Sequence, residues 1–174
     1  MLNRKIFFLL LMMAGGITQA ATPLAKISVI AEAERPVAPA FEIENLRGGN
    51  SSLLDYKGKL VLLNFWATWC VPCTKEMPGM ETLWQDYKEQ GLEIVAVSVD
   101  EGSRSRIENF SKMFGINFPI LLDPESEVSD LYEVSGVPTS FLIDRNGKII
   151  ARIVGTEDWL SPDAVSLVQE LLAQ

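Results

Sequence analysis

Hydrophobic residues of this chain fall into short runs that alternate with longer segments of helical periodicity, beginning near Phe41. The run from Leu60 to Trp66 is almost continuously apolar, which is typical of a strand buried on both faces of a sheet. Further runs bounded by glycine or polar turns predict strands at 41–44, 92–99, 118–122, 140–143 and 148–154. The last two of these strands are close enough in sequence to form a hairpin.

Between these runs, apolar residues recur three or four positions apart and predict helices. The longest starts at Cys70 and continues to about Gln90, where Gly91 provides a stop. Other helices are expected at 105–114, 128–134 and 161–172. Ser161 is the expected N-cap of the last one. This order predicts an α/β fold with a mixed central sheet flanked by helices.

The N-terminal residues have the pattern of a secretory signal peptide. Arg4 and Lys5 precede an apolar run at 6–14, and the small residues around Ala20 suit signal peptidase. The expected division of the chain is a signal peptide at 1–20, a linker at 21–37 and one domain at 38–174. The apolar run is shorter than the roughly 20 residues of a membrane-spanning helix. We therefore expect export to the periplasm, with an uncleaved anchor that leaves the domain facing the periplasm as the alternative.

Composition and charge exclude several classes of function. The net charge is −8 and the 15 basic residues are scattered, so no nucleic-acid partner is expected. The chain has no histidine, which removes the usual general base and the commonest metal ligand. Two cysteines are too few for a four-thiolate zinc site. We expect neither a metal nor a cofactor, and we expect the two cysteines to react with each other or with a partner.

A predicted strand leads directly into Cys70-Val71-Pro72-Cys73 at the start of a predicted helix. Unpaired N–H groups and the positive end of the helix dipole favour a thiolate there. Cys70 is therefore the expected attacking thiol, and Cys73, one turn later, the resolving thiol of a redox-active disulfide. The alternative is an inert structural disulfide, but so small a ring constrains little of the unfolded chain and stabilises little.

The segment Phe65-Trp66-Ala67-Thr68-Trp69-Cys70-Val71-Pro72-Cys73 is followed by Glu76 and Pro78, and later by Gly136-Val137-Pro138-Thr139. Over about residues 38–172, these motifs resemble the TlpA/ResA/CcmG branch of the thioredoxin-like proteins. The resemblance implies a thioredoxin-like fold with an N-terminal β-hairpin extension and a helix inserted before the strand after Pro138. It also implies an exported or membrane-anchored thiol-disulfide oxidoreductase that reduces disulfides of client proteins, such as apocytochrome c. The upstream electron donor would be another partner, for which a membrane thiol-disulfide transporter is one candidate.

The same resemblance assigns roles to individual residues. Pro138 matches a cis-proline beside the cysteines, and Val137 would present its backbone to substrate. Asn64 occupies the position where cytosolic-type thioredoxins carry a buried acid, and an amide cannot accept a proton in its place. Glu76, on the helical face of Cys73, is therefore the expected proton acceptor during resolution. The alternative is a solvated glutamate that only favours the helix dipole.

Several large apolar residues surround these motifs. Trp66 is expected in the core, whereas Trp69, next to the nucleophile, could equally pack or form part of the surface that binds substrate. The methionines expected to fill the core are Met77, Met80 and Met113.

The leading hypothesis is a reductase kept in its dithiol form by a partner. Neither Val71 nor Pro72, between the cysteines, carries a charge or an imidazole that would strongly stabilise the reduced form, which favours donation of electrons. An oxidase or isomerase of the same compartment is the first alternative. A peroxidase needs an activated peroxide-reactive cysteine in its own pocket, which the paired cysteines argue against. A non-catalytic binding module with a structural disulfide is the last alternative.

Overall fold

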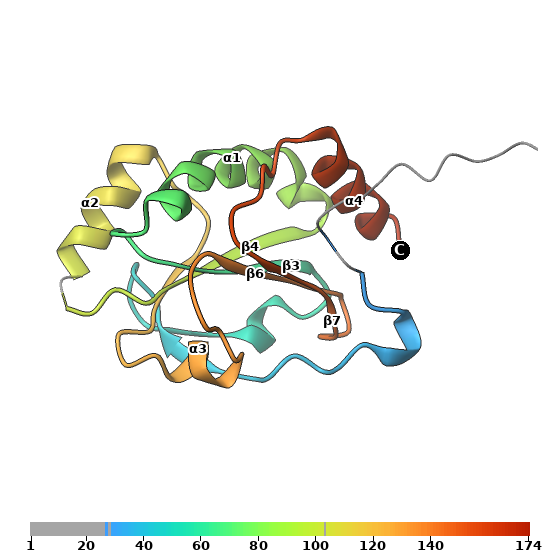
Figure 1. Cartoon of the computed structure of the whole chain (residues 1–174), viewed down its shortest axis with the longest axis horizontal. Coiled ribbons are helices and arrows are strands. Elements are labelled where there is room, and N and C mark those ends of the chain that lie inside the picture. Colours follow the sequence, from blue (N-terminus) through green and yellow to red (C-terminus); the bar gives the residue numbers. More distant parts are fainter. Residues whose placement is uncertain (1–26, 28, 103) are drawn as a thin grey trace, which may run out of the picture.

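A mixed five-stranded sheet forms the centre of the computed structural model, which describes Ile27, residues 29–102 and residues 104–174 (Figure 1). Its strands, in spatial order, are β5 (Ile120–Leu122), β4 (Leu92–Ser98), β3 (Leu60–Trp66), β6 (Thr139–Ile143) and β7 (Ile149–Val154). Strand β3 is parallel to β4 and antiparallel to β6; β4 and β5 are parallel, and β6 and β7 antiparallel. Because β3 and β4 run in parallel, the segments that follow them emerge at the same edge of the sheet.

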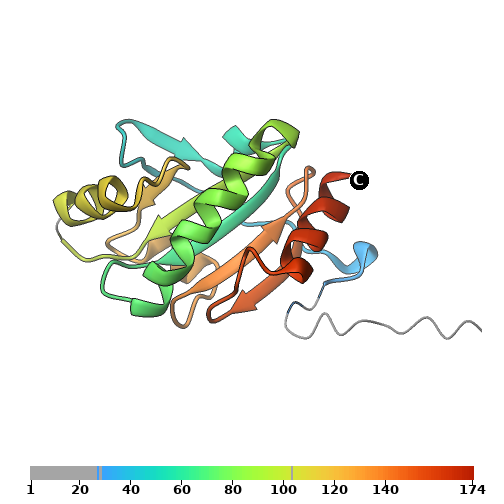
Figure 2. The ribbon, with the colours of Figure 1, turned by 90° about the horizontal axis from the view of Figure 1, so that it is seen from above.

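Helices and a hairpin cover the two faces of this sheet (Figures 1 and 2). One face carries α1 (Val71–Tyr87), α2 (Arg104–Phe114) and α4 (Pro162–Leu172). The opposite face carries α3 (Glu127–Leu131) and the antiparallel pair β1 (Glu42–Glu44) and β2 (Asn50–Ser52). Short 3-10 turns complete the described elements at Glu32–Glu34, Leu53–Tyr56 and Lys88–Gln90.

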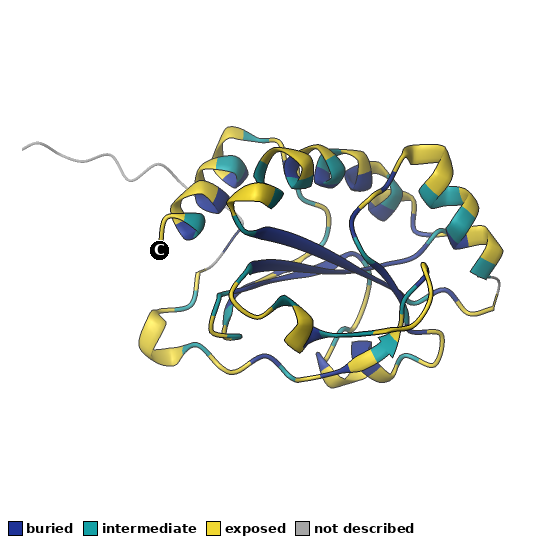
Figure 3. Cartoon of the chain, turned by 180° about the vertical axis from the view of Figure 1, so that it is seen from behind, coloured by how far each residue is buried: buried dark blue, intermediate teal, exposed yellow. Residues whose placement is uncertain are grey.

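The alternation of side chains along β3 divides the core in two. Leu60, Leu62 and Trp66 belong to the cluster beneath α1, α2 and α4, whereas the intervening Leu63 and Phe65 belong to the cluster on the other face. Every residue of β3 and β4 is buried, as the dark strands of Figure 3 show. This double burial accounts for the continuous apolar runs in the sequence.

The strands and helices expected from the sequence are confirmed, with small changes at their ends. The expected helix at 128–134 is shorter and forms α3, because Glu133 adopts a positive φ of 53° that a right-handed helix cannot continue through. Ser161 caps α4 as predicted, accepting the N–H of Ala164 at 3.3 Å.

The described part of the expected linker contacts the sheet instead of extending away from it. Val29 pairs with Ala151 of β7, and the Ile30 N–H donates to the carbonyl of Ile150 at 2.7 Å. Arg35 lies 3.4 Å from the carboxylate of Asp144, in the turn between β6 and β7. Within the described residues, contacts with the sheet therefore include residues 29–35 of the expected linker.

The expected signal peptide at 1–20 and the first residues of the linker lie outside the described residues. Within the part of the chain that the structure describes, no helix is both long enough and apolar enough to cross a membrane.

Candidate redox site

Cys70 and Cys73 form a disulfide where β3 leads into α1, with their Cα atoms 5.3 Å apart. Cys70 is the N-cap residue of α1, and its Sγ accepts the N–H of Cys73 at 3.3 Å. Cys70 is 6% exposed and Cys73 is fully buried. Of the two cysteines, the one at the helix N-terminus keeps some exposure, which favours Cys70 as the attacking thiol.

The peptide bond between Val137 and Pro138 is cis, and this turn lies against the disulfide. The carbonyl oxygen of Val137 is 3.6 Å from the Sγ of Cys70, a packing contact because a disulfide sulfur has no proton to donate. Pro138 is buried and Val137 is half-buried. The structure thus brings Val137 and Pro138 beside the reactive sulfur, where the resemblance places them.

The loop before Cys70 is anchored by Asp100, a residue that the sequence analysis did not select. Its carboxylate accepts the Thr68 N–H at 2.8 Å and the Thr68 hydroxyl at 2.5 Å. The Ser98 hydroxyl donates to the same carboxylate at 2.7 Å. The sequence feature that could have identified Asp100 is its position immediately after the predicted strand at 92–99, at the sheet edge where the cysteines also lie.

Replacing Asp100 with alanine is expected to lower stability by about 2–3 kcal/mol, because it leaves buried donors without their charged acceptor. It is also expected to change the alkylation rate of reduced Cys70, because the loop holding Thr68 loosens. Asp123→Ala is the matched control: Asp123 is also buried and accepts two backbone N–H groups of α3, on the face away from the cysteines. Chemical denaturation and iodoacetamide kinetics measure both effects. Equal changes in alkylation for both variants would contradict a specific role for Asp100.

Glu76 is buried in α1, one turn after Cys73, and is only 6% exposed. Its Oε1 accepts the side-chain amide of Asn64 at 3.0 Å and its Oε2 accepts the backbone N–H of Glu157 at 3.2 Å. Burial raises the pKa of Glu76 to about 7, against the lowering effect of these two hydrogen bonds, and the Glu157 carboxylate raises it further. The interpretation of Glu76 as a solvated charge is therefore wrong. A carboxyl group that titrates near neutral pH is suited to accept and release a proton.

Asn64 connects Glu76 to the central sheet. It lies on β3, on the face covered by α1, and its Nδ2 also donates to the hydroxyl of Ser140 on β6 at 2.9 Å. Its Oδ1 is buried without a hydrogen-bond partner among the described residues. Asn64, at the position where cytosolic-type thioredoxins carry a buried acid, thus binds the carboxyl group of Glu76 on α1.

Large apolar residues near the cysteines divide between core and surface. Trp66 is fully buried as expected, and so are Met77 and Met80, whereas Trp69 is 62% exposed beside the disulfide. The expectation that Met113 fills the core is wrong, because Met113 is 77% exposed. Met113 lies six positions after the buried Ile107 in α2, which turns it roughly 120° away from the core-facing side of the helix.

Comparison with known proteins agrees with this geometry. The family model described as AhpC/TSA matches residues 35–152. The chain is 43% identical to the thiol-disulfide oxidoreductase ResA of Geobacillus thermodenitrificans over 153 residues, which cover 88% of this chain and 86% of that protein. The chain belongs to the ResA branch of the thioredoxin family.

Further members of this family support the assignment. ResA of Geobacillus kaustophilus is 49% identical over 119 residues, covering 68% of each protein. The crystal structure of a thiol:disulfide interchange protein DsbE, described as putative, from Chlorobium tepidum matches with a TM-score of 0.70 and 37% identity, covering 80% of this chain and 95% of that one. The thioredoxin-like fold expected from the sequence is confirmed, and the chain is a thiol-disulfide oxidoreductase.

Family membership also decides among the alternatives raised by the sequence. A non-catalytic module with an inert disulfide is wrong for a member of this enzyme family. The pairing of Cys70 with Cys73 at a helix start is the arrangement of dithiol exchange.

Proposed function

We propose that the chain is an exported reductase that transfers two electrons from the Cys70–Cys73 dithiol to disulfides of client proteins in the periplasm. The observation that carries this proposal is the asymmetry of the site. Cys70 caps a helix N-terminus and keeps 6% exposure, whereas Cys73 is fully buried one turn from a carboxyl group whose pKa is about 7. This asymmetry suits a mechanism in which one thiol attacks and the other is deprotonated later.

The reaction starts with both cysteines reduced. The Cys70 thiolate attacks one sulfur of the client disulfide, forming a mixed disulfide and releasing the first client thiolate. Glu76 then takes the proton of Cys73, and the resulting thiolate attacks the Cys70 sulfur and releases the second client thiolate. Protons from Glu76 and solvent reach the released thiolates. The client gains two electrons and two protons, and the Cys70–Cys73 disulfide remains.

Binding of the client is assigned to the residues around the accessible sulfur. The carbonyl of Val137, held in place by cis-Pro138, lies beside Cys70 and is positioned to pair with an extended client backbone. Trp69 offers exposed aromatic surface next to the same sulfur. Apocytochrome c awaiting haem is the proposed client, and a membrane thiol-disulfide transporter the proposed donor that restores the dithiol.

A Cys73→Ala variant expressed in the native compartment tests this proposal, since it can attack but cannot resolve. We expect clients to remain attached to Cys70 through mixed disulfides, with apocytochrome c among them. A parallel assay compares the reduced protein acting on an oxidised client with the oxidised protein acting on a reduced client. Faster disulfide formation than disulfide reduction would overturn the reductase in favour of the oxidase.

The mature protein is expected to begin near Ala21, because a basic start, a short apolar run and small residues at 18–20 form a cleavable signal. N-terminal sequencing of the protein recovered from the periplasmic fraction measures this. Recovery from the membrane fraction with Met1 intact would instead establish the uncleaved anchor.

A further inference from the structure

A groove of about 660 Å³ opens between the loop before Cys70 and one face of α2. The groove is lined by Thr68 and Trp69 on the loop, and by Ser105, Arg106, Asn109, Phe110 and Met113 on the helix. Four of the helix residues, from Arg106 to Met113, occupy positions i, i+3, i+4 and i+7, so these four form one continuous face. Because Trp69 directly precedes Cys70 in the chain, one side of the groove is formed by the residue next to the redox pair.

The groove combines apolar surface with an arginine that has no ion-pair partner among the described residues. Met113 and Trp69 are 77% and 62% exposed, and Phe110 forms a half-buried ring between them and the core, with its centroid 4.9 Å from that of Trp66. Methionine is suited to surfaces that accept varied partners, because its side chain is flexible and polarisable. Arg106 is exposed and forms no ion pair or hydrogen bond with the described residues.

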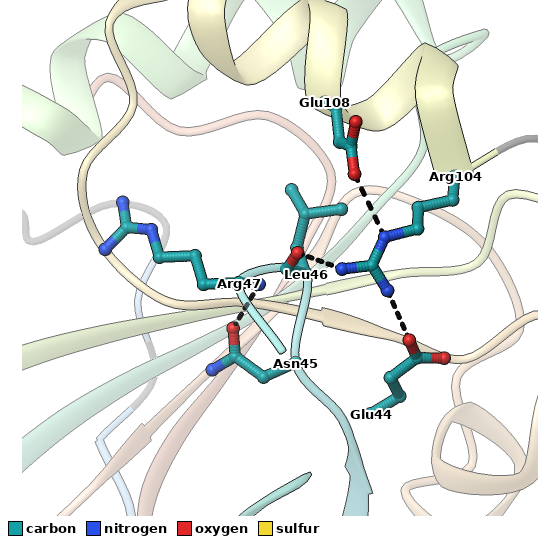
Figure 4. Close-up of polar contacts among 6 residues, drawn as sticks. All are labelled: Glu44, Asn45, Leu46, Arg47, Arg104 and Glu108. Atoms are coloured by element: carbon teal, nitrogen blue, oxygen red, sulfur yellow. Dashed lines mark hydrogen bonds and ion pairs between the residues drawn. The ribbon is translucent and has the colours of Figure 1, made fainter. Parts of the chain in front are cut away.

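Arg104, the other arginine of α2, has a different role from Arg106. Arg104 contacts the carboxylates of Glu44 and Glu108 and the carbonyl of Leu46, as Figure 4 shows. The contacts with Glu44 and Leu46 tie the start of α2 to the end of β1 and the residues after it. At 100° per residue, Arg104 lies roughly 160° around the helix from Arg106. The helix is thus anchored by one arginine, and Arg106 is left to face the groove.

We propose that this groove, which we name the α2 groove, binds an extended segment of the client polypeptide next to its disulfide. An apolar client side chain lies over Phe110 between Trp69 and Met113, and a client carboxylate pairs with Arg106. The charge of the occupant follows from the positive charge at the groove. Although the chain has a net charge of −8, Arg106 lines the groove without an ion-pair partner among the described residues, so it attracts an acidic group. This inference rests on the proposed reductase function and names the client chemistry that the enzyme prefers.

Reduction of short synthetic peptide disulfides tests the α2 groove, with kcat/KM as the readout. One peptide carries Leu and Glu beside its cysteines, a second carries Leu and Lys, and a third carries Ser and Glu. Bis(2-hydroxyethyl) disulfide, which is uncharged and too small to reach the groove, reports the chemistry at Cys70 alone. Wild type is expected to prefer the Leu–Glu peptide.

Arg106→Glu is expected to lower kcat/KM for the Leu–Glu peptide about fivefold and to raise it for the Leu–Lys peptide. Met113→Ser is expected to lower kcat/KM about five- to tenfold for both leucine peptides but not for the serine peptide, because apolar burial is lost. Lys112→Glu makes the same charge change on α2 at a residue that lines the opposite side of the helix, and it is expected to leave all three peptides unaffected. The small disulfide is expected to react equally with every variant.

Three results would overturn the α2 groove as a client site. If Arg106→Glu and Lys112→Glu had equal effects, the preference for the Leu–Glu peptide would come from the overall charge of the protein and not from the groove. A second result would be that neither Arg106→Glu nor Met113→Ser changes the peptide rates while the small disulfide is still reduced. The α2 groove would then not bind the client, but the proposed reductase function would stand. Sedimentation showing self-association that Met113→Ser abolishes would make a second copy of the chain the occupant. Failure of the wild type to reduce even the small disulfide would instead overturn the proposed function itself.

Discussion

Cys70→Ser is expected to abolish disulfide reduction, whereas Cys73→Ser is expected to attack once and stop at the mixed disulfide. A serine hydroxyl at position 70 cannot replace the thiolate that the helix N-terminus stabilises. In the second variant the attacking sulfur remains, but the buried group that releases the client is no longer a thiol. Single-turnover kinetics and mass spectrometry of the trapped adduct measure these two outcomes.

Alkylation of the reduced wild-type protein provides an independent check of the same assignment. Cys70 is expected to react with iodoacetamide faster than Cys73, because it is the partly exposed sulfur and the helix cap. Faster modification of Cys73 would reverse the roles of attacking and resolving thiol.

Glu76→Gln is expected to slow release of the client from the mixed disulfide about 10²-fold at neutral pH, the lower end for general acid–base catalysis. Glutamine keeps the shape of the side chain but cannot accept the proton of Cys73. In wild type the release rate should rise as Glu76 ionises, through pH of about 7, and then level off. In the variant it should rise only near pH 8.5, with ionisation of an ordinary thiol. Stopped-flow measurement across this range tests the proposal, and superimposable profiles would make Glu76 a structural group.

Stability gives a second readout for Glu76 with a definite sign. Its pKa is raised from 4.5 to about 7 in the folded protein, so the folded state holds a proton that the unfolded state has already lost between these values. The free energy of unfolding of the oxidised wild type, relative to that of Glu76→Gln, should therefore fall as pH rises from 4.5 to 7, by roughly 3 kcal/mol in total. Denaturant titrations at several pH values measure this difference. A constant difference would show that Glu76 is not held in its neutral form by burial.

Local patterns in the sequence predicted the elements of the fold and the central chemistry of the site. The apolar run of β3 and the helical spacing of α1 are short-range features that depend on burial of one segment at a time. Cys70 and Cys73 lie where these two elements meet, so their places at a helix start followed from the sequence alone. The cis-proline at Pro138 did not follow from local pattern, and only resemblance to relatives indicated it.

The surroundings of Glu76 were decided by tertiary structure. Its partners Asn64 and Glu157 lie 12 and 81 positions away in the chain, and no local periodicity relates them. The raised pKa depends on burial by segments that meet only when α1 packs on the sheet. The sequence could name the acid, but it could not show that burial raises its pKa to about 7.

The error at Met113 has the same origin. Periodicity in α2 identifies an amphipathic helix, but it does not show how wide a stripe the sheet covers. Only the folded chain shows that the face from Arg106 to Met113 is left uncovered beside Trp69. Sequence by itself therefore determined the segments and the pairing of the two cysteines at a helix start, because these depend on neighbours within one turn or one strand. The order of attack stays a prediction. Tertiary structure decided the proton acceptor's environment, the anchoring of the loop by Asp100 and the α2 groove, because each requires contact between segments distant along the chain.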